Sequence, residues 1–413
     1  MKLPVVAERF IKYAKFDSQS AYESESYPST SKQLLLAKEL VADMQKIGLE
    51  DVHMDQYGYV YGTLPANVEG DVPKIGFLAH MDTTPEMTAE NVNPQVIENY
   101  DGGDIVLNKE GCVLSPEQSP ELSDYIGGTL ITTDGCSLLG VDDKAGVAEI
   151  ITAMEYLVNN NNIPHGTIKV AFTPDEEVGR GVKYFDINKF GVDYAYTLDG
   201  GPIGELCYET FNAALAKVEV NGKNVHPGVA KNKMINAIDI MMELNSMLPA
   251  DQKPQYTEKL EGYFHALIIS GDVDRCCESF YIRDHDMDKF QFKKELIENA
   301  VEFLNNKHGE NTVKLVLEDQ YYNIKYKLEN VMFIVDILEK AAVEIGLKPY
   351  FKAFRGGTDG SWLTNRGLPT PNIFIGGHNY HGRYEYVPVY SMEKAVEVIV
   401  KVAELFTNKE NYN

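Results

Sequence analysis

The sequence predicts an α/β protein, with a discontinuous first domain that is interrupted by an inserted ferredoxin-like βαββαβ domain. Short apolar runs typical of buried strands alternate with helical segments in the first half of the chain. The order of predicted elements then changes to βαββαβ, and the first pattern returns afterwards. We therefore expect one α/β domain made of residues 1–210 and 323–413, and a second domain at 211–322.

Helices are predicted where apolar residues recur at the helical period. The segment 31–47 is an example, because Leu36, Leu40 and Met44 share one face and Gly48 provides a stop signal. The other predicted helices cover residues 3–15, the segment from about 144, 232–248, 288–309, 328–346 and 391–407.

Four predicted strands of the first part each end in a loop that contains an acidic residue or a histidine. These ends lie at His80-Met81-Asp82, before Asp142, before Glu176-Glu177 and at Asp199. In open α/β sheets, ligands bind at the carboxyl ends of the strands, so these residues are candidates for a common site. The region 86–128 has weak periodicity, and we expect it to be a long excursion with hairpins.

Composition excludes several classes of protein. The chain has 413 residues, with 62 acidic and 38 basic side chains and a net charge of −24, which argues against nucleic acid or an anionic membrane as its main partner. No window offers the ~18 apolar residues of a membrane span, and the first residues do not form a signal peptide, so we predict a cytoplasmic location. The five cysteines have no spacing pattern typical of disulfides or zinc.

The residues at the strand ends, together with one later histidine, form a constellation that indicates a metal site. Taken singly, each has an ordinary explanation, such as a core histidine, a helix cap or a turn. Together, histidines and carboxylates without cysteine suit zinc, manganese or cobalt, and two metals can share one bridging carboxylate. One further carboxylate can then carry the proton. The set is His80, Asp82, Asp142, Asp143, Glu176, Glu177, Asp199 and His381.

Seven motifs carry a resemblance to a known family. The sequence resembles the peptidase T branch of the cocatalytic zinc peptidases, a family that also includes aminoacylases, carboxypeptidase G and succinyl-diaminopimelate desuccinylase. The motifs span nearly the whole chain in the family's order. They are LAHMDTTP at 78–85, LLGVDDKAGVAEI at 138–150, TPDEEVGRG at 173–181, YTLDGG at 196–201, NVHPG at 224–228, FRGGTDGS at 354–361 and NYHGRYE at 379–385.

The resemblance implies two zinc ions per subunit, with cobalt or manganese as alternatives. It implies that His80 and Asp199 bind one metal, that Glu177 and His381 bind the other, and that Asp142 bridges both. The native metal stays open at this point.

The resemblance also implies the residues that act beside the metals. Glu176 would be the general base and acid, and Asp82 would orient the imidazole of His80. His378 is an alternative ligand to His381, which we prefer because it matches the family's His-Gly pair.

We expect the inserted domain to act as a lid and as a dimerisation element. By resemblance, His226 reaches the substrate carbonyl. Arg283 on the lid and Arg355 on the catalytic domain are the candidates to bind the terminal carboxylate of a peptide, because a guanidinium matches that group with two parallel hydrogen bonds. Arg355 has a Gly-Gly neighbour, and shaping a loop is its alternative role.

The resemblance implies an aminopeptidase that releases the N-terminal residue from tripeptides by metal-activated attack of water on the peptide carbonyl. Its partners would be short peptides. The nearest alternative is a sister enzyme with the same site, such as a dipeptidase, a deacylase or a carboxypeptidase. A non-catalytic metal-binding protein and a carboxylate-pair glycosidase are the alternatives from other classes.

Overall fold

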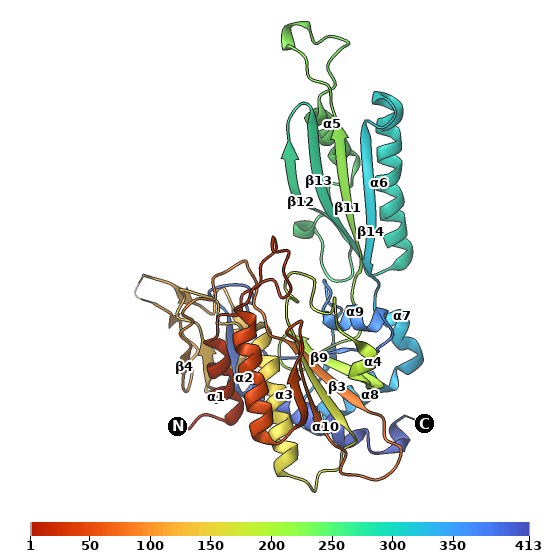
Figure 1. Ribbon diagram of the computed structural model, residues 1–413. Coiled ribbons are helices and arrows are strands. Elements are labelled where there is room, and N and C mark those ends of the chain that lie inside the picture. Colours follow the sequence, from red (N-terminus) through yellow and green to blue (C-terminus); the bar gives the residue numbers. More distant parts are fainter. Residues whose placement is uncertain (1, 109, 413) are drawn as a thin grey trace. The chain divides into compact units, whose positions relative to one another are not determined.

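The computed structural model describes residues 2–108 and 110–412. The chain forms two compact units. Unit 1 comprises Met1–Tyr208, Lys327–Lys352 and Thr358–Asn413, and unit 2 comprises Glu209–Tyr326 and Ala353–Gly357. Both are visible in Figure 1, where unit 2 contains the elements β11 to β14.

Unit 1 is built on an eight-stranded sheet of order β1-β2-β8-β3-β9-β16-β10-β15. Its centre is parallel, since β3 (Ile75–His80) lies between β8 (Ile168–Thr173) and β9 (Tyr194–Gly200), and β16 (Asn372–Phe374) follows β9. Every residue of β3 is buried, as expected for a parallel strand covered on both faces. The outer strands are β1 (Glu50–Met54), β2 (Val60–Leu64), β10 (Glu205–Cys207) and β15 (Tyr350–Phe351).

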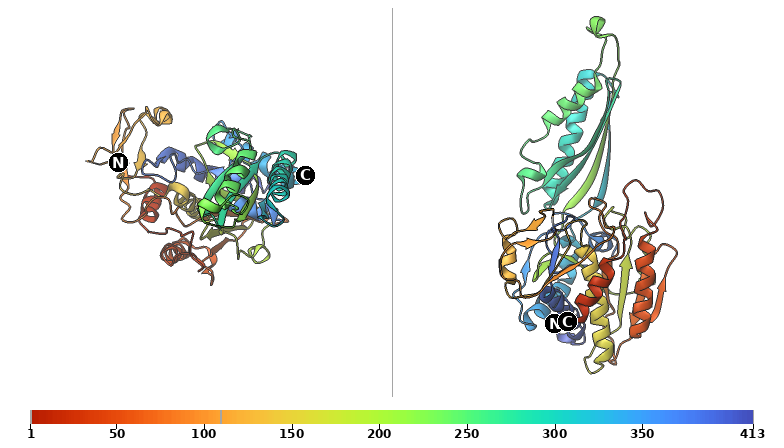
Figure 2. Two further views of the ribbon diagram at one scale, coloured as in Figure 1. Left: turned by 90° about the horizontal axis from the view of Figure 1, so that it is seen from above. Right: turned by 90° about the vertical axis from the view of Figure 1, so that its left-hand side faces the viewer.

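Helices cover both faces of this sheet (Figures 1 and 2). On one face, α3 contacts β3 and β9, and it also packs against α1 and α10. On the other face, α4 and α9 enclose an apolar cluster that includes Leu78, Phe185 and Trp362. The bounds are α1 (Val5–Ala14), α2 (Gln33–Ile47), α3 (Val141–Asn159), α4 (Ile187–Phe190), α8 (Phe333–Glu344), α9 (Asp359–Asn365) and α10 (Val389–Leu405).

The region 86–128 contributes β4, β5 and β6 to two small antiparallel sheets of unit 1. One has the order β17-β7-β4 and the other pairs β5 with β6. Tyr100, Leu122 and Tyr386 lie in their common apolar core. The bounds are β4 (Gln95–Ile97), β5 (Ile105–Val106), β6 (Val113–Leu114), η1 (Pro120–Tyr125), β7 (Leu130–Thr132) and β17 (Tyr386–Pro388).

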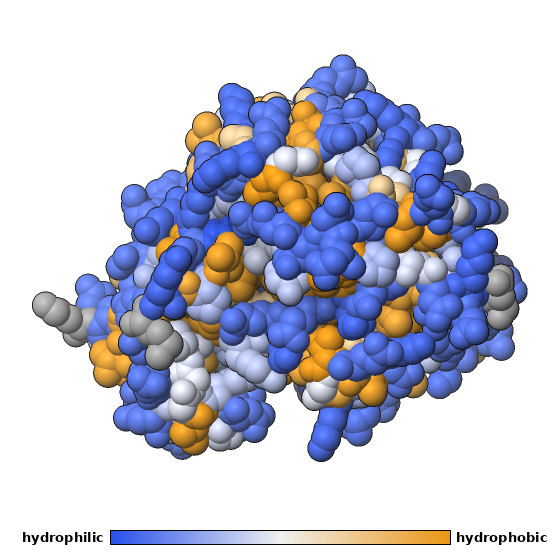
Figure 3. Space-filling view, turned by 90° about the horizontal axis from the view of Figure 1, so that it is seen from below, coloured by the Kyte–Doolittle hydropathy of each residue, from blue (hydrophilic) through white to orange (hydrophobic). Residues whose placement is uncertain are grey.

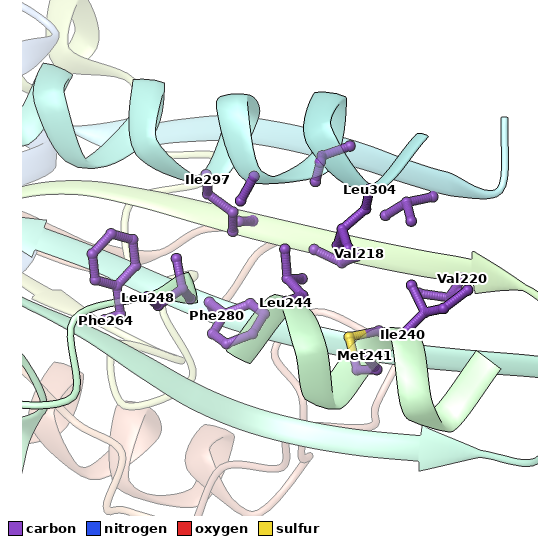
Figure 4. Close-up of a cluster of buried hydrophobic side chains, with 14 of the residues drawn as sticks. Val218, Val220, Ile240, Met241, Leu244, Leu248, Phe264, Phe280, Ile297 and Leu304 are labelled. Atoms are coloured by element: carbon purple, nitrogen blue, oxygen red, sulfur yellow. The ribbon is translucent and has the colours of Figure 1, made fainter. Parts of the chain in front are cut away.

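Unit 2 has the element order βαββαβ and an antiparallel sheet of order β12-β13-β11-β14. Its core lies between the sheet and helices α5 and α6, where side chains such as Leu244, Phe280 and Ile297 interlock (Figure 4). The bounds are β11 (Asn212–Asn221), α5 (Ala237–Met247), β12 (Tyr263–Gly271), β13 (Arg275–Asp284), α6 (Met287–His308) and β14 (Val313–Tyr321).

The predicted α/β class is confirmed, and the differences are local. The helix expected at 328–346 is divided into α7 (Lys325–Leu328), the 3-10 turn η4 (Glu329–Val331) and α8. The helix expected at 232–248 begins later, because the side chain of Asn236 accepts a hydrogen bond from the Ile238 N–H and caps α5.

The surface is polar in the view of Figure 3, where hydrophobic residues are interspersed among hydrophilic ones. Among residues 2–108 and 110–412, no helix has the length and apolar character needed to cross a membrane.

Candidate metal centre

Strand direction explains why the acidic residues and His80 meet. Strands β8, β3 and β9 are adjacent and parallel, so their carboxyl ends share one edge of the sheet. His80 ends β3, Asp199 lies near the end of β9, and Glu176 and Glu177 follow β8. Asp142 joins them from the first turn of α3, where it has non-helical backbone angles and a cis peptide bond to the next residue.

Asp142 lies between two histidines. Its Oδ1 is 2.9 Å from His80 Nε2, and its Oδ2 is 3.4 Å from His381 Nε2. His80 Nε2 is also 3.9 Å from Asp199 Oδ1, while His381 Nε2 is 3.1 Å from Glu177 Oε2. The Asp142 carboxylate thus faces two separate sets of potential metal ligands, a geometry that suits a ligand shared by two cations.

The donor set fits divalent cations. His80, Asp142 and Glu177 each offer an atom within 4.8 Å of the others, and so do His80, Glu176 and Asp199. Glu177 Oε1 is buried and has no hydrogen-bond partner among the described residues. Imidazoles and carboxylates without thiolates are typical ligands of zinc, manganese or cobalt.

The electrostatics indicate an excess of buried carboxylates. Burial raises the pKa of Glu176 and of Asp199 well above the usual values, and the charge of a neighbouring aspartate adds to this in each case. Burial likewise raises the pKa of Glu177 to about 7. The pKa of Asp142 is lowered, because hydrogen bonds with His381 and His80 outweigh its burial. A bound cation would relieve this repulsion.

Comparison with known proteins identifies the family. Residues 132–405 match the model of the peptidase family M20/M25/M40. The chain belongs to this family. Its curated relatives include Peptidase T of Alkaliphilus oremlandii, 56% identical over 405 residues, which cover 97% of this chain and 99% of the relative. Peptidase T of Bacillus subtilis is 55% identical over 402 residues, with 97% and 98% covered.

Solved structures agree with this assignment. The crystal structure of aminopeptidase PepT from Bacillus cereus aligns with a TM-score of 0.75 at 25% identity and covers 98% of each chain. A dinuclear metal-binding peptidase of family M20 from Bacillus subtilis aligns with a TM-score of 0.65 at 12% identity, with 97% of each chain covered, and shows the fold alone. The resemblance to peptidase T that the motifs indicated is therefore confirmed.

In this M20-family chain, Asp82 supports more than one element of the centre. It is fully buried. Its carboxylate accepts hydrogen bonds from the backbone N–H groups of Glu176 at 2.9 Å and Glu177 at 3.2 Å. His80 Nδ1 lies 3.0 Å from the Asp82 carbonyl oxygen and 3.4 Å from Oδ1. Asp82 therefore ties the end of β3 to the loop after β8.

Sequence reasoning gave no role to Glu385, although it ends the motif NYHGRYE. Its buried carboxylate accepts hydrogen bonds from the N–H groups of Leu139 at 2.8 Å, Gly140 at 2.7 Å and Asp142 at 3.2 Å. Three donors to one carboxylate fix the backbone that carries Asp142. The only available signal was its place in the motif, four residues after His381.

Asp359 was also without a predicted role. It is buried at the start of α9, and it accepts a hydrogen bond from Thr173 Oγ1 at 2.6 Å. Burial raises the pKa of Asp359 to about 7, and its charge contributes to the raised pKa of Glu176. It thus helps to set the protonation of the loop that follows β8.

Two candidates of the sequence analysis lie outside the cluster. Asp143 is buried and accepts a hydrogen bond from the His80 backbone N–H through Oδ2 at 2.9 Å. His378, the alternative ligand, stacks on Tyr386 at 4.8 Å between ring centroids, and its Nε2 is 2.8 Å from Tyr125 Oη.

The remaining candidates lie in unit 2. Arg283 on β13 is 9% exposed, donates a hydrogen bond to Tyr321 Oη at 2.9 Å, and has no carboxylate partner among the described residues. His226 is exposed and accepts a hydrogen bond from the Gly228 N–H. Arg355 lies in unit 2 and not in the catalytic segment where the sequence analysis placed it.

The guanidinium of Arg355 is occupied by the chain itself. It donates to the carbonyl oxygens of Lys259 and Glu261, both at 2.8 Å, and to Thr257 Oγ1 at 2.8 Å. These bonds connect the 354–357 segment with the loop before β12, which favours the loop-shaping alternative.

Proposed function

We propose that this protein is a metal-dependent aminopeptidase that releases the N-terminal residue from tripeptides. The observation that carries the proposal is the position of Asp142 between His80 and His381, with a further carboxylate beside each histidine. The relatives named Peptidase T, 55–56% identical over nearly the whole chain, support the substrate class.

In this proposal, two divalent cations would share Asp142 as a ligand. His80 and Asp199 would hold one of them, and Glu177 and His381 would hold the other. Zinc is the proposed metal, with cobalt and manganese as alternatives. A pair of such cations polarises a peptide carbonyl and lowers the pKa of water.

Glu176 is the proposed proton carrier. Its Oε2 lies 4.0 Å from His80 Nε2, so the carboxylate borders the cluster. The raised pKa of Glu176 suits a group that takes a proton from the attacking water and gives it to the leaving amine. Asp82 positions Glu176 for this proton transfer, because its carboxylate accepts hydrogen bonds from the backbone N–H groups of Glu176 and Glu177 and lies next to the imidazole of His80.

The proposed ligand of the peptide's terminal carboxylate is Arg283. Arg283 has no carboxylate partner among the described residues, and a guanidinium can bind a terminal carboxylate with two parallel hydrogen bonds. His226 is proposed to hold the carbonyl oxygen of the substrate. The role proposed for Arg355 is to fix the loop before β12, since both of its terminal NH₂ groups already donate to that loop.

The separate roles of the two glutamates give the sharpest test. Glu176→Gln should keep the metal content of the wild type and lower tripeptide turnover by about 10²–10⁴-fold. Glu177→Gln should lower the metal content itself. Metal analysis and hydrolysis of Ala-Ala-Ala measure both effects. Loss of metal in the Glu176 variant but not in the Glu177 variant would refute the assignment.

A substrate panel separates the proposal from its sister activities. Ala-Ala-Ala should be hydrolysed well, and Ala-Ala, the tetrapeptide and N-acetyl-Ala poorly. Arg283→Ala should raise KM for the tripeptide and leave a C-terminally amidated tripeptide unaffected. Arg275→Ala is the matched control, because Arg275 is exposed on the same strand. Equal losses on both substrates would argue against Arg283 as the carboxylate ligand.

We also propose a homodimer through unit 2 and a cytoplasmic location. Strand β12 is an edge of the sheet, and Ile268 and Ile269 on it are 69% and 57% exposed. Exposed apolar edge strands favour pairing. Light scattering of the wild type and of Ile268→Lys tests the dimer, and cell fractionation tests the location.

A further inference from the structure

We propose that unit 1 carries a second ligand site, for a small organic anion with a flat ring, on the open face of strands β1, β2 and β8. A pocket of about 400 Å³ lies there, bordered by α4. Residues of the metal centre do not line it. Three features define the proposed site: the floor of the pocket, a pair of stacked rings and two lysines.

The register of the strands builds the floor. His53 pairs with Tyr61, and Thr63 pairs with Lys169, so these side chains share one face of the sheet. The opposite face is closed at Gly62, where an added Cβ would lie 3.0 Å from Met44 Sδ of α2. The edge of the sheet is therefore packed on one side and open on the other.

Two aromatic rings offer a flat surface. The rings of His53 and Tyr61 are stacked, with centroids 5.3 Å apart and planes at 28°. Tyr61 also packs against Phe185 and Phe190, whose ring centroids lie 5.7 and 6.2 Å from its own. His53 is exposed. A planar ligand group can stack against such a supported pair.

Two lysines supply positive charge to the same pocket. Lys189 Nζ lies 6.0 Å from the Tyr61 centroid, and Lys169 Nζ would be 3.8 Å from a Cβ on Gly191 at the end of α4. Within the described part of the chain, neither ammonium group forms an ion pair. In a chain of net charge −24, two such lysines in one pocket favour an anion. Of the described lining residues, Asp51 is a carboxylate and Lys169 and Lys189 are cationic. Burial, with the charges of Asp55 and Asp186, raises the pKa of Tyr61, so these two carboxylates also lie near the pocket.

The site is separate from the metal centre along β8. Lys169 is near the start of this strand, and Thr173 at its end precedes the loop with Glu176 and Glu177. Four residues of strand span roughly 13 Å. A ligand at Lys169 therefore lies away from the reacting groups.

Phenyl phosphate is the probe, and calorimetric titration of the metal-loaded full chain is the measurement. Inorganic phosphate has the charge without the ring, and phenol has the ring without the charge. Both should bind at least about tenfold more weakly than phenyl phosphate, since the proposed site uses stacking and charge together. Because phosphate groups also bind divalent cations, the titration is repeated after metal removal with a chelator, and binding to this pocket should persist.

Amino-acid substitutions test whether phenyl phosphate binds in this pocket. Lys169→Met and Lys189→Met should each weaken phenyl phosphate binding by about tenfold, the loss expected for one charge-assisted contact. Lys46→Met, an exposed lysine of α2 outside the pocket, should leave it unchanged. His53→Ala should weaken phenyl phosphate binding and spare inorganic phosphate. Benzoate in place of phenyl phosphate then distinguishes a carboxylate from a phosphate ligand.

Three outcomes would contradict the proposed anion site. If binding disappears on metal removal, the anion occupies the metal centre and the proposal is wrong. Equal affinities in Lys169→Met, Lys189→Met and Lys46→Met would also overturn it, as would absence of binding for both phenyl phosphate and benzoate.

Discussion

Glu385 offers a test of how the metal centre is supported, because it touches the backbone at Asp142 and not the proposed metals. Glu385→Gln keeps the size of the side chain and replaces one carboxylate oxygen by an NH₂ group. The remaining oxygen can serve the N–H groups of Leu139 and Gly140 or that of Asp142, but not all three. At least one N–H group then faces another donor.

The expected magnitude follows from the lost bond. A hydrogen bond to a charged group contributes about 1.5–3 kcal/mol, so the backbone at Asp142 should loosen, and metal affinity should fall roughly ten- to hundredfold. Burial raises the pKa of Glu385 to about 7, so the measurement belongs at about pH 8, where the wild-type carboxylate is ionised.

Competition with a chelator measures the affinity, and turnover at saturating metal is recorded beside it. Glu339→Gln is the control, because Glu339 is exposed on α8 and forms no ion pair among the described residues. If Glu385→Gln holds metal as tightly as the wild type, Glu385 does not position Asp142.

Two further predictions concern stability. Lys293 Nζ lies 2.8 Å from Asp284 Oδ2, and both side chains are buried, so Lys293→Met should lower the free energy of unfolding in urea by about 3–5 kcal/mol; a loss no larger than that of Lys294→Met, whose partner is more exposed, would contradict this. The second prediction concerns the metal-free protein. Burial raises the pKa of Glu177 from 4.5 to about 7. For His381, hydrogen bonds and charge attraction from Asp142 and Glu177 outweigh the effect of burial and raise the pKa from 6.5 to about 12. The folded state then binds more protons than the unfolded chain at both groups, so the unfolding temperature should fall as pH rises from about 5 to 8, and zinc should restore more stability at pH 8 than at pH 5. A metal-free unfolding temperature that rises over this range would show that other groups dominate.

The residues that meet at the carboxyl ends of neighbouring strands could be predicted from the sequence. Parallel strands place their carboxyl ends together, so the proximity of His80, Glu177 and Asp199 follows once β3, β8 and β9 are recognised as neighbours. The strands of the region 86–128 were harder to predict, because they have two or three residues each and are too short for an alternating apolar pattern to be recognised.

The supporting residues could not be predicted, because their partners are distant in sequence. Glu385 contacts Leu139 and Gly140 more than 240 residues earlier, and Asp359 contacts Thr173. Neither residue type nor local spacing indicates such contacts. The surroundings of Arg355 depend likewise on a loop almost 100 residues away.

Two buried carboxylates therefore stabilise different parts of the proposed centre. Asp82 holds the backbone of Glu176 and Glu177, while Glu385 holds that of Asp142. Adjacent glutamates can serve different purposes here because the loop turns sharply, with Asp175 at a φ of +60°. Glu176 then faces His80 and Asp199, and Glu177 faces His381. Disturbing Asp82 should impair proton transfer and metal binding together, whereas disturbing Glu385 should act on metal binding alone, so the two supports are separable by experiment.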